Sequence, residues 1–245
     1  MDTTLSPGEV ALVGGGPGDP DLLTLAAWRM LEQADVILHD RLGPVSALDR
    51  LPHSPELVPV GKIPRGDFTP QERINELLVQ YAKAGKRVVR LKGGDSYVFG
   101  RGGEEWLACI AAGVPVRVIP GVTSSVAAPA LAGVPVTHRG VTQGFTVVSG
   151  HVPPSDERSD INWRALAQSH TTLVLLMAVK FLPEIADELM AGGLPSDTPV
   201  AIIVEGSLPT QERHLTTLGE ARAAIAEISP PSVVVIGQVA GLGLL

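Results

Sequence analysis

The chain has 245 residues, which is enough for one large domain or for two smaller ones. Hydrophobic residues make up 44% and charged residues 18%, a balance that excludes an intrinsically disordered chain. The net charge of −7 argues against general electrostatic binding to nucleic acid or to an anionic membrane, so neither is expected as a partner.

The first half of the chain alternates predicted strands and helices. The predicted strands cover residues 10–13, 36–39, 57–60, 87–91 and 116–119. The predicted helices cover residues 22–33, 70–84, 103–112 and 123–131, with Thr69 as N-cap and Pro70 at the first position of the second helix. This alternation predicts a parallel sheet with helices on its faces.

The second half begins after a linker near residues 134–140 and repeats the alternation less regularly. Predicted strands cover residues 145–149, 172–177, 200–204, 213–217 and 233–236, and predicted helices 163–168, 182–190 and 220–227. The segment 213–217 alternates polar and apolar residues, which indicates an antiparallel strand and a sheet of mixed directions. We therefore expect two α/β domains, covering residues 1–135 and 136–245.

The sequence contains no predicted membrane span or signal peptide and has one cysteine. No apolar run approaches the ~18 residues of a membrane span, and the N-terminus lacks the pattern of a signal peptide, so we expect a soluble, cytoplasmic protein. The single cysteine, Cys109, excludes a disulfide scaffold or a cysteine-rich metal site within one chain. Its apolar surroundings favour a buried thiol.

Glycines and polar residues follow most predicted strands, where ligands bind in open α/β sheets. These segments are residues 14–19, 39–41, 61–62, 92–95, 120–125, 149–151, 177, 205–206 and 237. The first glycine loop does not match a dinucleotide fingerprint, because Pro17 and Asp19 occupy positions that require glycine in its two possible registers. No phosphate-binding P-loop motif occurs either. A cleft between two such sheet edges would form a two-domain active site.

Four segments of the chain resemble the signatures of the tetrapyrrole methylases. They are VGGGPGDPDLLT at 13–24, RLKGGDSYVFGRGGEE at 90–105, VIPGVTSS at 118–125 and GVPVTHR at 133–139. Within that family the set is most similar to the members that methylate uroporphyrinogen III. The resemblance runs from about Val10 to the C-terminus and implies two α/β domains with the active site in the cleft between them.

The resemblance implies that S-adenosylmethionine is the cofactor, S-adenosylhomocysteine its product, and that no metal is needed. The residues that the motifs place at the cofactor are Pro17, Gly93, Gly94, Asp95, Val98, Thr123, Ser124, Met177 and Gly206. These residue types suit the ligand, since glycine turns admit a close approach to backbone and a carboxylate can accept from ribose or ammonium groups. Taken alone, Met177 would more simply be a core residue.

The implied reaction is the transfer of two methyl groups to uroporphyrinogen III, giving precorrin-2. Alignment makes Asp40 the proton acceptor and Lys62 the proton donor, although solvated loop charges are the alternative interpretation of both. The substrate carries eight carboxylates, for which arginine is the natural partner. The candidates for binding them are Arg41, Arg65, Arg101, His138 and Arg139, with His151 beside them.

Two alternatives remain: a methyltransferase that acts on a later precorrin, and a non-enzymatic nucleotide-binding regulator. A regulator would keep the glycine loops but would not need the set of Asp, Lys and Arg residues. The family resemblance also implies a homodimer. His151 is a poor metal ligand, because no second ligand lies at metal-binding spacing from it.

Overall fold

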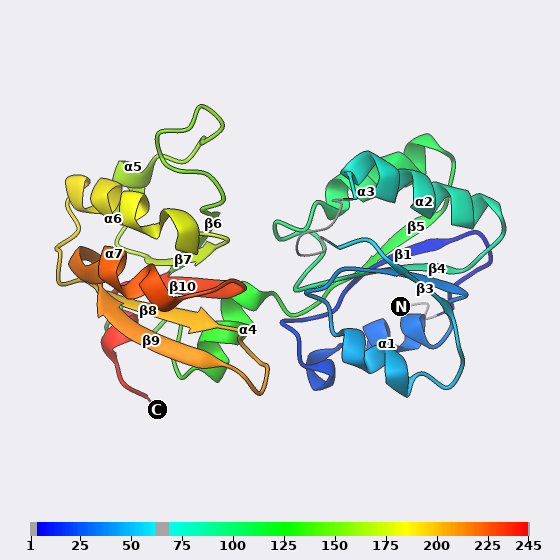
Figure 1. Ribbon diagram of the computed structural model, residues 1–245, viewed down its shortest axis with the longest axis horizontal. Coiled ribbons are helices and arrows are strands. Elements are labelled where there is room, and N and C mark those ends of the chain that lie inside the picture. The colour runs from blue at the N-terminus through cyan, green and yellow to red at the C-terminus, as the bar shows by residue number, and fades with distance from the viewer. Residues whose placement is uncertain (1–3, 62–68, 245) are drawn as a thin grey trace. The chain divides into compact units, whose positions relative to one another are not determined.

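The computed structural model describes residues 4–61 and 69–244, which form two compact units, Met1–Ser124 and Ser125–Leu245 (Figure 1). The boundary expected from sequence, after residue 135, lies beyond helix α4 (Ser124–Leu131). Nearly all of α4 belongs to the second unit, because Ala128 and the following Ala132 pack into the apolar core there.

The first unit contains a five-stranded sheet in which every pairing is parallel, as predicted. Its order is β3-β2-β4-β1-β5, so β4 is central. The strands are β1 (Val10–Gly14), β2 (Val36–His39), β3 (Glu56–Pro59), β4 (Val88–Lys92) and β5 (Val116–Ile119). The helices are α1 (Leu25–Leu31), α2 (Gln71–Lys83) and α3 (Gly102–Ala111), with 3-10 turns at Pro20–Leu22 and Val45–Arg50.

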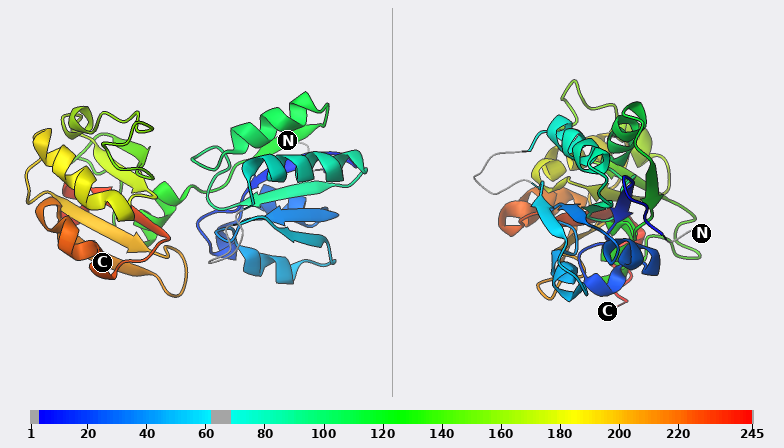
Figure 2. Two further views of the ribbon diagram at one scale, coloured as in Figure 1. Left: turned by 45° about the horizontal axis from the view of Figure 1, so that its top comes forward. Right: turned by 90° about the vertical axis from the view of Figure 1, so that its right-hand side faces the viewer.

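Helices cover both faces of this sheet and make three layers (Figures 1 and 2). Alternate strand residues explain the layers, since successive side chains of a strand point to opposite faces. Val13 and Val89 pack with Met30 of α1 on one face. Leu12 and Val88 pack with Leu78 of α2 on the other.

The second unit contains a mixed sheet of order β6-β7-β10-β8-β9. Only β6 and β7 pair in parallel, and the segment expected to be antiparallel is indeed so. The strands are β6 (Phe145–Ser149), β7 (Thr172–Leu176), β8 (Pro199–Val204), β9 (Glu212–Thr217) and β10 (Ser232–Ile236). The helices are α5 (Trp163–Ala167), α6 (Leu182–Ala191) and α7 (Ala221–Ala224), with 3-10 turns at Val179–Phe181, Leu218–Glu220, Ile225–Glu227 and Gln238–Gly241.

The interior of the second sheet is aliphatic on both faces. On β10, Val234 and Ile236 pack into the cluster that includes α6, while Val233 and Val235 pack into the cluster that includes α4. The predicted fold of two α/β units is confirmed. The expected cleft between them stays a prediction, because each unit is described by itself.

The predicted helix boundaries differ from the structure by one or more residues, as three of the helices show. The helix expected from residue 22 begins at Leu25, because the Thr24 hydroxyl accepts a hydrogen bond from the Ala27 amide and caps it. The helix expected from Pro70 begins one residue later, since Pro70 keeps an extended ψ of 151°. The helix expected at 220–227 is α7 with a 3-10 turn on each side.

Candidate active site

The parallel strands of the first unit bring the loops after β1, β2, β4 and β5 to one edge of the sheet. Three of these loops touch through backbone alone. A Cβ atom added to Gly121 would lie 2.4 Å from the Gly94 carbonyl oxygen, and one added to Gly14 would lie 2.5 Å from the Gly121 nitrogen. Only glycine fits at such distances, so the three loops pack against one another through their backbones.

The loops after β1 and β4 are also joined by a reciprocal pair of hydrogen bonds. The Gly16 amide donates to the Gly94 carbonyl (3.1 Å), and the Gly94 amide donates to the Gly16 carbonyl (2.6 Å). Both glycines have positive φ angles, 79° and 65°. This bridge fixes the turn that carries Pro17 against the turn that carries Asp95.

Asp95 ties the β4 loop to the β5 loop. Its Oδ2 atom accepts from the Gly121 amide at 3.0 Å, and its Oδ1 atom accepts from the Tyr97 amide at 2.8 Å. The Val98 amide donates to the Asp95 carbonyl at 3.3 Å. Asp95 therefore has the structural role of a residue that caps a tight turn, the interpretation that the Gly-Gly-Asp segment favours when taken alone, and its contact with a cofactor stays a prediction.

Thr123 and Ser124 lie half-buried after β5, next to this bridge. A Cβ atom on Gly94 would lie 3.4 Å from the Ser124 hydroxyl oxygen, within ordinary contact. The structure thus brings the predicted cofactor residues of the first unit into one group of loops. That group consists of Pro17, Gly93, Gly94, Asp95, Val98, Thr123 and Ser124.

Asp40 lies at the same edge, immediately after β2. Its Oδ1 atom accepts a hydrogen bond of 2.7 Å from Nη2 of Arg90, and its side chain is 28% exposed. The loop that follows it touches the glycine turn, since a Cβ atom on Gly93 would lie 2.7 Å from the Leu42 carbonyl oxygen. Asp40 is therefore joined through neighbouring backbone to the loops that are predicted to bind the cofactor.

Arg90 belongs to a buried group of charges that sequence reasoning missed. Its Nε atom and Nζ of Lys92 both donate at 2.9 Å to Oε1 of Glu105 on α3, whose side chain is fully buried. Gln71 adds a weaker contact of 3.4 Å to the same oxygen. The signal was in the sequence: Arg90 and Lys92 stand two residues apart in the central strand, so they share a face.

The surroundings shift the pKa values of both cations. Burial by itself lowers the pKa of Arg90, but the Asp40 and Glu105 carboxylates outweigh it and raise that pKa above its usual value. Burial and the neighbouring Arg90 charge lower the pKa of Lys92, and Glu105 offsets them only in part. The guanidinium is thus the fixed positive charge of this group.

The residues predicted to bind the substrate carboxylates are spread over both units, unlike the predicted cofactor residues of the first unit. Arg41 is exposed next to Asp40. Arg101 has a left-handed φ of 58° and is held by two hydrogen bonds of 2.7 Å from its guanidinium to Glu104. His138 and Arg139 are exposed in the second unit. Two of the predicted site residues, Lys62 and Arg65, lie outside the described residues.

In the second unit, Met177 follows β7 and Gly206 follows β8, at the same edge of that sheet. Met177 is 53% exposed with a φ of 57°, and Glu205 and Ser207 on either side of Gly206 have φ angles of 48° and 80°. Such angles are costly for residues other than glycine and gather at functional sites. A Cβ atom on Gly206 would lie 2.5 Å from Cβ of Ala128, so no larger residue fits there.

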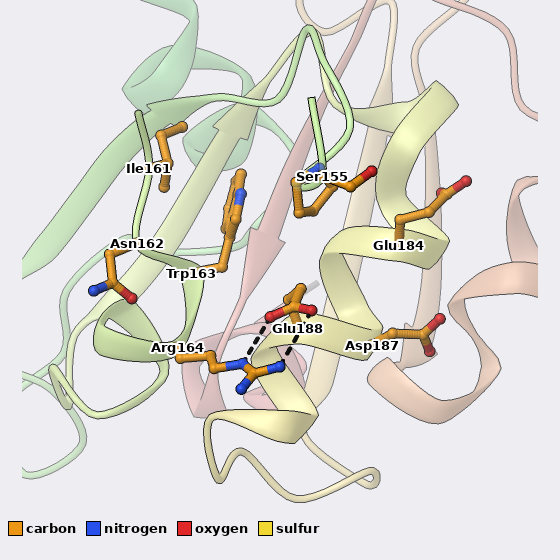
Figure 3. Close-up of a pocket in the computed structure, with 9 residues that line it drawn as sticks. Ser155, Ile161, Asn162, Trp163, Arg164, Glu184, Asp187 and Glu188 are labelled. Atoms are coloured by element: carbon orange, nitrogen blue, oxygen red, sulfur yellow. Dashed lines mark hydrogen bonds and ion pairs between the residues drawn. The ribbon is translucent and has the colours of Figure 1, made fainter. Parts of the chain in front are cut away.

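A pocket of about 540 Å³ in the second unit contains none of the predicted site residues (Figure 3). It is lined by acidic side chains of α6, of which Glu188 is held by Arg164 at 2.8 Å. Its acidic lining does not suit an anionic substrate. Within residues 4–61 and 69–244, no group of His, Cys, Asp and Glu could hold a metal ion, and no helix is long and apolar enough to cross a membrane.

Comparison with known proteins shows where the chain belongs. The profile of the family described as Tetrapyrrole (Corrin/Porphyrin) Methylases matches residues 9–222. An S-adenosyl-L-methionine-dependent uroporphyrinogen III methyltransferase from Methanosarcina barkeri is 48% identical over 238 residues, which cover 96% of this chain and 93% of that protein. A siroheme synthase from Acinetobacter baylyi is 44% identical over 98% of this chain, which spans 52% of that protein, about half its length.

Solved structures agree. The uroporphyrin-III C-methyl transferase from Thermus thermophilus, complexed with S-adenosylhomocysteine, is 43% identical with a TM-score of 0.81 over 94% of this chain and 98% of that one. A cobalt precorrin-4 methyltransferase has a TM-score of 0.84 over 95% and 96% of the two chains, but at 24% identity it shows the fold alone. The family predicted from the glycine motifs is confirmed: this chain belongs to the tetrapyrrole methylases.

Proposed function

We propose that the chain is an S-adenosylmethionine-dependent C-methyltransferase that adds two methyl groups to uroporphyrinogen III and forms precorrin-2. The observation that carries this proposal is the meeting of the backbone-only glycine loops and of Asp40 at one edge of the first sheet. The names of the relatives from Methanosarcina barkeri and Thermus thermophilus support the same substrate and cofactor.

The glycine loops fit S-adenosylmethionine. Because Gly14 and Gly121 leave no room for a Cβ atom and Gly94 has a positive φ of 65°, these positions carry no side chain, and a ligand at this edge can approach the backbone of the loops closely. Asp95 and Thr123 lie at the same loops and can bond ribose hydroxyls or the ammonium group. Met177 and Gly206 would complete the site from the second unit. When bound, the cofactor supplies an electrophilic methyl group on a sulfonium sulfur.

Asp40 would take up the proton that the tetrapyrrole ring system, through a pyrrole N–H or a bridging methylene, must lose after a ring carbon gains the methyl group. Its Oδ1 atom is held by Arg90, whereas no hydrogen bond from the described residues occupies its Oδ2 atom. A fixed carboxylate with one oxygen available is what a general base requires. The pyrrole ring is electron-rich, so the chain need only orient it and move protons. Lys62 as proton donor stays a prediction.

Arginines near this edge would bind the substrate carboxylates. Arg41 follows Asp40 directly and is exposed. Arg101 is paired with Glu104, but both side chains are about half exposed (49% and 51%), and an ion pair of that kind contributes about 0–1 kcal/mol. A substrate carboxylate can therefore replace Glu104 at little cost. His138 and Arg139 would add contacts from the second unit.

The test is an anaerobic incubation with uroporphyrinogen III and methyl-labelled S-adenosylmethionine, with the product followed by mass and absorbance. We expect two labelled methyl groups per product molecule. Cofactor binding without transfer would contradict the substrate and favour a later precorrin. Neither binding nor transfer would contradict the proposed activity and favour the regulator. The homodimer and the cytoplasmic location stay predictions, which light scattering and cell fractionation test.

A further inference from the structure

Glu105 occupies an unusual place for a carboxylate, with no exposed surface in the first turn of α3. Nζ of Lys92 and Nε of Arg90 converge on its Oε1 atom, each at 2.9 Å. Its second oxygen, Oε2, has no hydrogen-bond partner among the described residues. Burying charges is costly, and a well-packed apolar group in their place is often as stable or more stable. Stability alone is therefore a weak reason for these charges.

The hydrogen bonds of Arg90 indicate what the charges do. Its Nε atom is held by Glu105, and its Nη1 atom donates to the Leu91 carbonyl at 3.1 Å, with a longer contact of 3.5 Å to the Leu38 carbonyl. The remaining nitrogen, Nη2, points to Oδ1 of Asp40 at 2.7 Å. The planar guanidinium is thus fixed at one end by a buried carboxylate and presents a single direction to Asp40.

We infer that Glu105, acting through Arg90, is a positioning residue that sets the orientation of the Asp40 carboxylate and so leaves Oδ2 directed to the substrate. The inference rests on the proposed function, because it assumes that Asp40 accepts the proton. Lys92 completes the group by balancing charge, since two cations then face the two carboxylates Glu105 and Asp40.

The test replaces the three supporting charges together. The variant Arg90→Met/Lys92→Met/Glu105→Leu leaves no unpaired buried charge, and Asp40 remains accessible to water. Asp40→Asn is then made both in the wild-type background and in this charge-free background. Removing a general base costs about 100-fold or more in kcat. If the group acts through Asp40, the charge-free variant has already lost most of that factor, so Asp40→Asn costs less than about 5-fold in it.

Each result separates positioning from a merely structural role. An equal cost of Asp40→Asn in both backgrounds would overturn the inference and leave the proposed function intact. No cost of Asp40→Asn in an active wild-type enzyme would overturn it too, since nothing would need positioning. Absence of methyl transfer by the wild-type chain is the failure of the proposed function itself, and the inference falls with it.

A second variant covers the case in which the charge-free protein does not fold. Arg90→Lys keeps the buried charge but loses the fork that joins Glu105 to Asp40. We expect kcat to fall about 10- to 100-fold, as for a misplaced catalytic group, with KM changed less than about 3-fold. Arg87→Lys, in the partly buried pair with Asp35 just before the same strand, is the matched control and should leave kcat unchanged. A change in KM alone for Arg90→Lys would contradict the inference.

Discussion

Two arginine–aspartate pairs join β2 to β4, one at each end of the strands. At the amino-terminal edge, Nη2 of Arg87 lies 2.7 Å from Oδ1 of Asp35, and the side chains are 38% and 31% exposed. At the carboxyl-terminal edge, the Arg90 and Asp40 pair has the same distance, but the arginine is 3% exposed. The same two residue types at the same distance therefore lie in very different surroundings.

The two pairs differ in the other hydrogen-bond partners of each arginine. Asp35 accepts three hydrogen bonds from Arg87, one from the Arg87 amide and two from its guanidinium. Asp35 is thus the single carboxylate partner of that guanidinium among the described residues. Arg90 is instead backed by a buried carboxylate and shares Asp40 with solvent. The first pair fastens two strands together. The second holds Asp40 at the edge where the glycine loops meet, and the proposed function of Asp40 would explain the cost of burying these charges.

Removing the support at the carboxyl-terminal edge should have the largest effect on stability. Glu105→Gln leaves Arg90 and Lys92 buried without their shared carboxylate, and we expect it to lower the free energy of unfolding by about 3–5 kcal/mol. Glu104→Gln, its half-exposed neighbour on the same helix, should cost less than about 1 kcal/mol. Urea unfolding of both variants measures this difference. Equal losses would contradict the buried-charge account.

Glycines at the two edges should also respond differently. Gly121→Ala forces a Cβ atom to within 2.4 Å of a backbone oxygen, and we expect it to cost about 1–3 kcal/mol of stability and to weaken cofactor binding. Gly113, before β5, has a φ of 70° but open space around it. There the left-handed conformation alone matters, so Gly113→Asn should be milder than Gly113→Ala, since Asn tolerates that conformation. At Gly121, Asn should be no better than Ala.

The partly buried pair of Asp35 and Arg87 should affect stability but not activity, and its contribution to stability should depend on pH. Hydrogen bonds from Arg87 lower the pKa of Asp35 to about 2, so its stabilisation is full above the unfolded-state pKa near 4 and is lost as the pH falls through 2. We expect Asp35→Asn to cost about 1 kcal/mol near pH 7, after allowance for solvent screening. The gap between variant and wild type should close toward pH 2. A gap independent of pH would contradict this account.

The reactivity of Cys109 should report on the packing of α3 against the sheet. It lies one helical turn after Glu105, is fully buried, and burial together with Glu105 raises the pKa of its thiol to about 11. Reaction with a disulfide reagent at pH 8 should be about 100-fold slower in the native protein than in the unfolded one. Glu105→Gln should speed the native reaction by loosening α3. Fast labelling of the native wild type would show that the thiol is accessible.

The positions of the strands along the chain could be predicted from the sequence, because a strand followed by a glycine turn and a helix is a local pattern. The predicted strand at 36–39 coincides with β2, and the segment 213–217 lies within β9. The start of α1 was missed, because a capping Thr24 competes with the apolar periodicity before it. The grouping of α4 with the second unit depends on tertiary packing and has no local signature.

The candidate site was predicted in part. The family motifs placed Asp40 and the glycine turns at strand ends, and the structure brings them to one edge. The motifs treated Asp95 as a ligand group, whereas the structure also shows it bonding Gly121, a contact between loops distant in sequence. The role of Glu105 could not be read from its neighbours, because its partners Arg90 and Lys92 meet it only when α3 packs on the sheet.

The most direct test of the comparison is to measure methyl transfer to uroporphyrinogen III by Asp40→Asn and Asp35→Asn side by side. Cofactor binding, measured by calorimetry, is the control for both variants. We predict that Asp40→Asn loses about 100-fold or more in kcat while it still binds S-adenosylhomocysteine, and that Asp35→Asn keeps wild-type kcat. Equal rates for the two variants would contradict the assignment of the carboxyl-terminal edge as the active site.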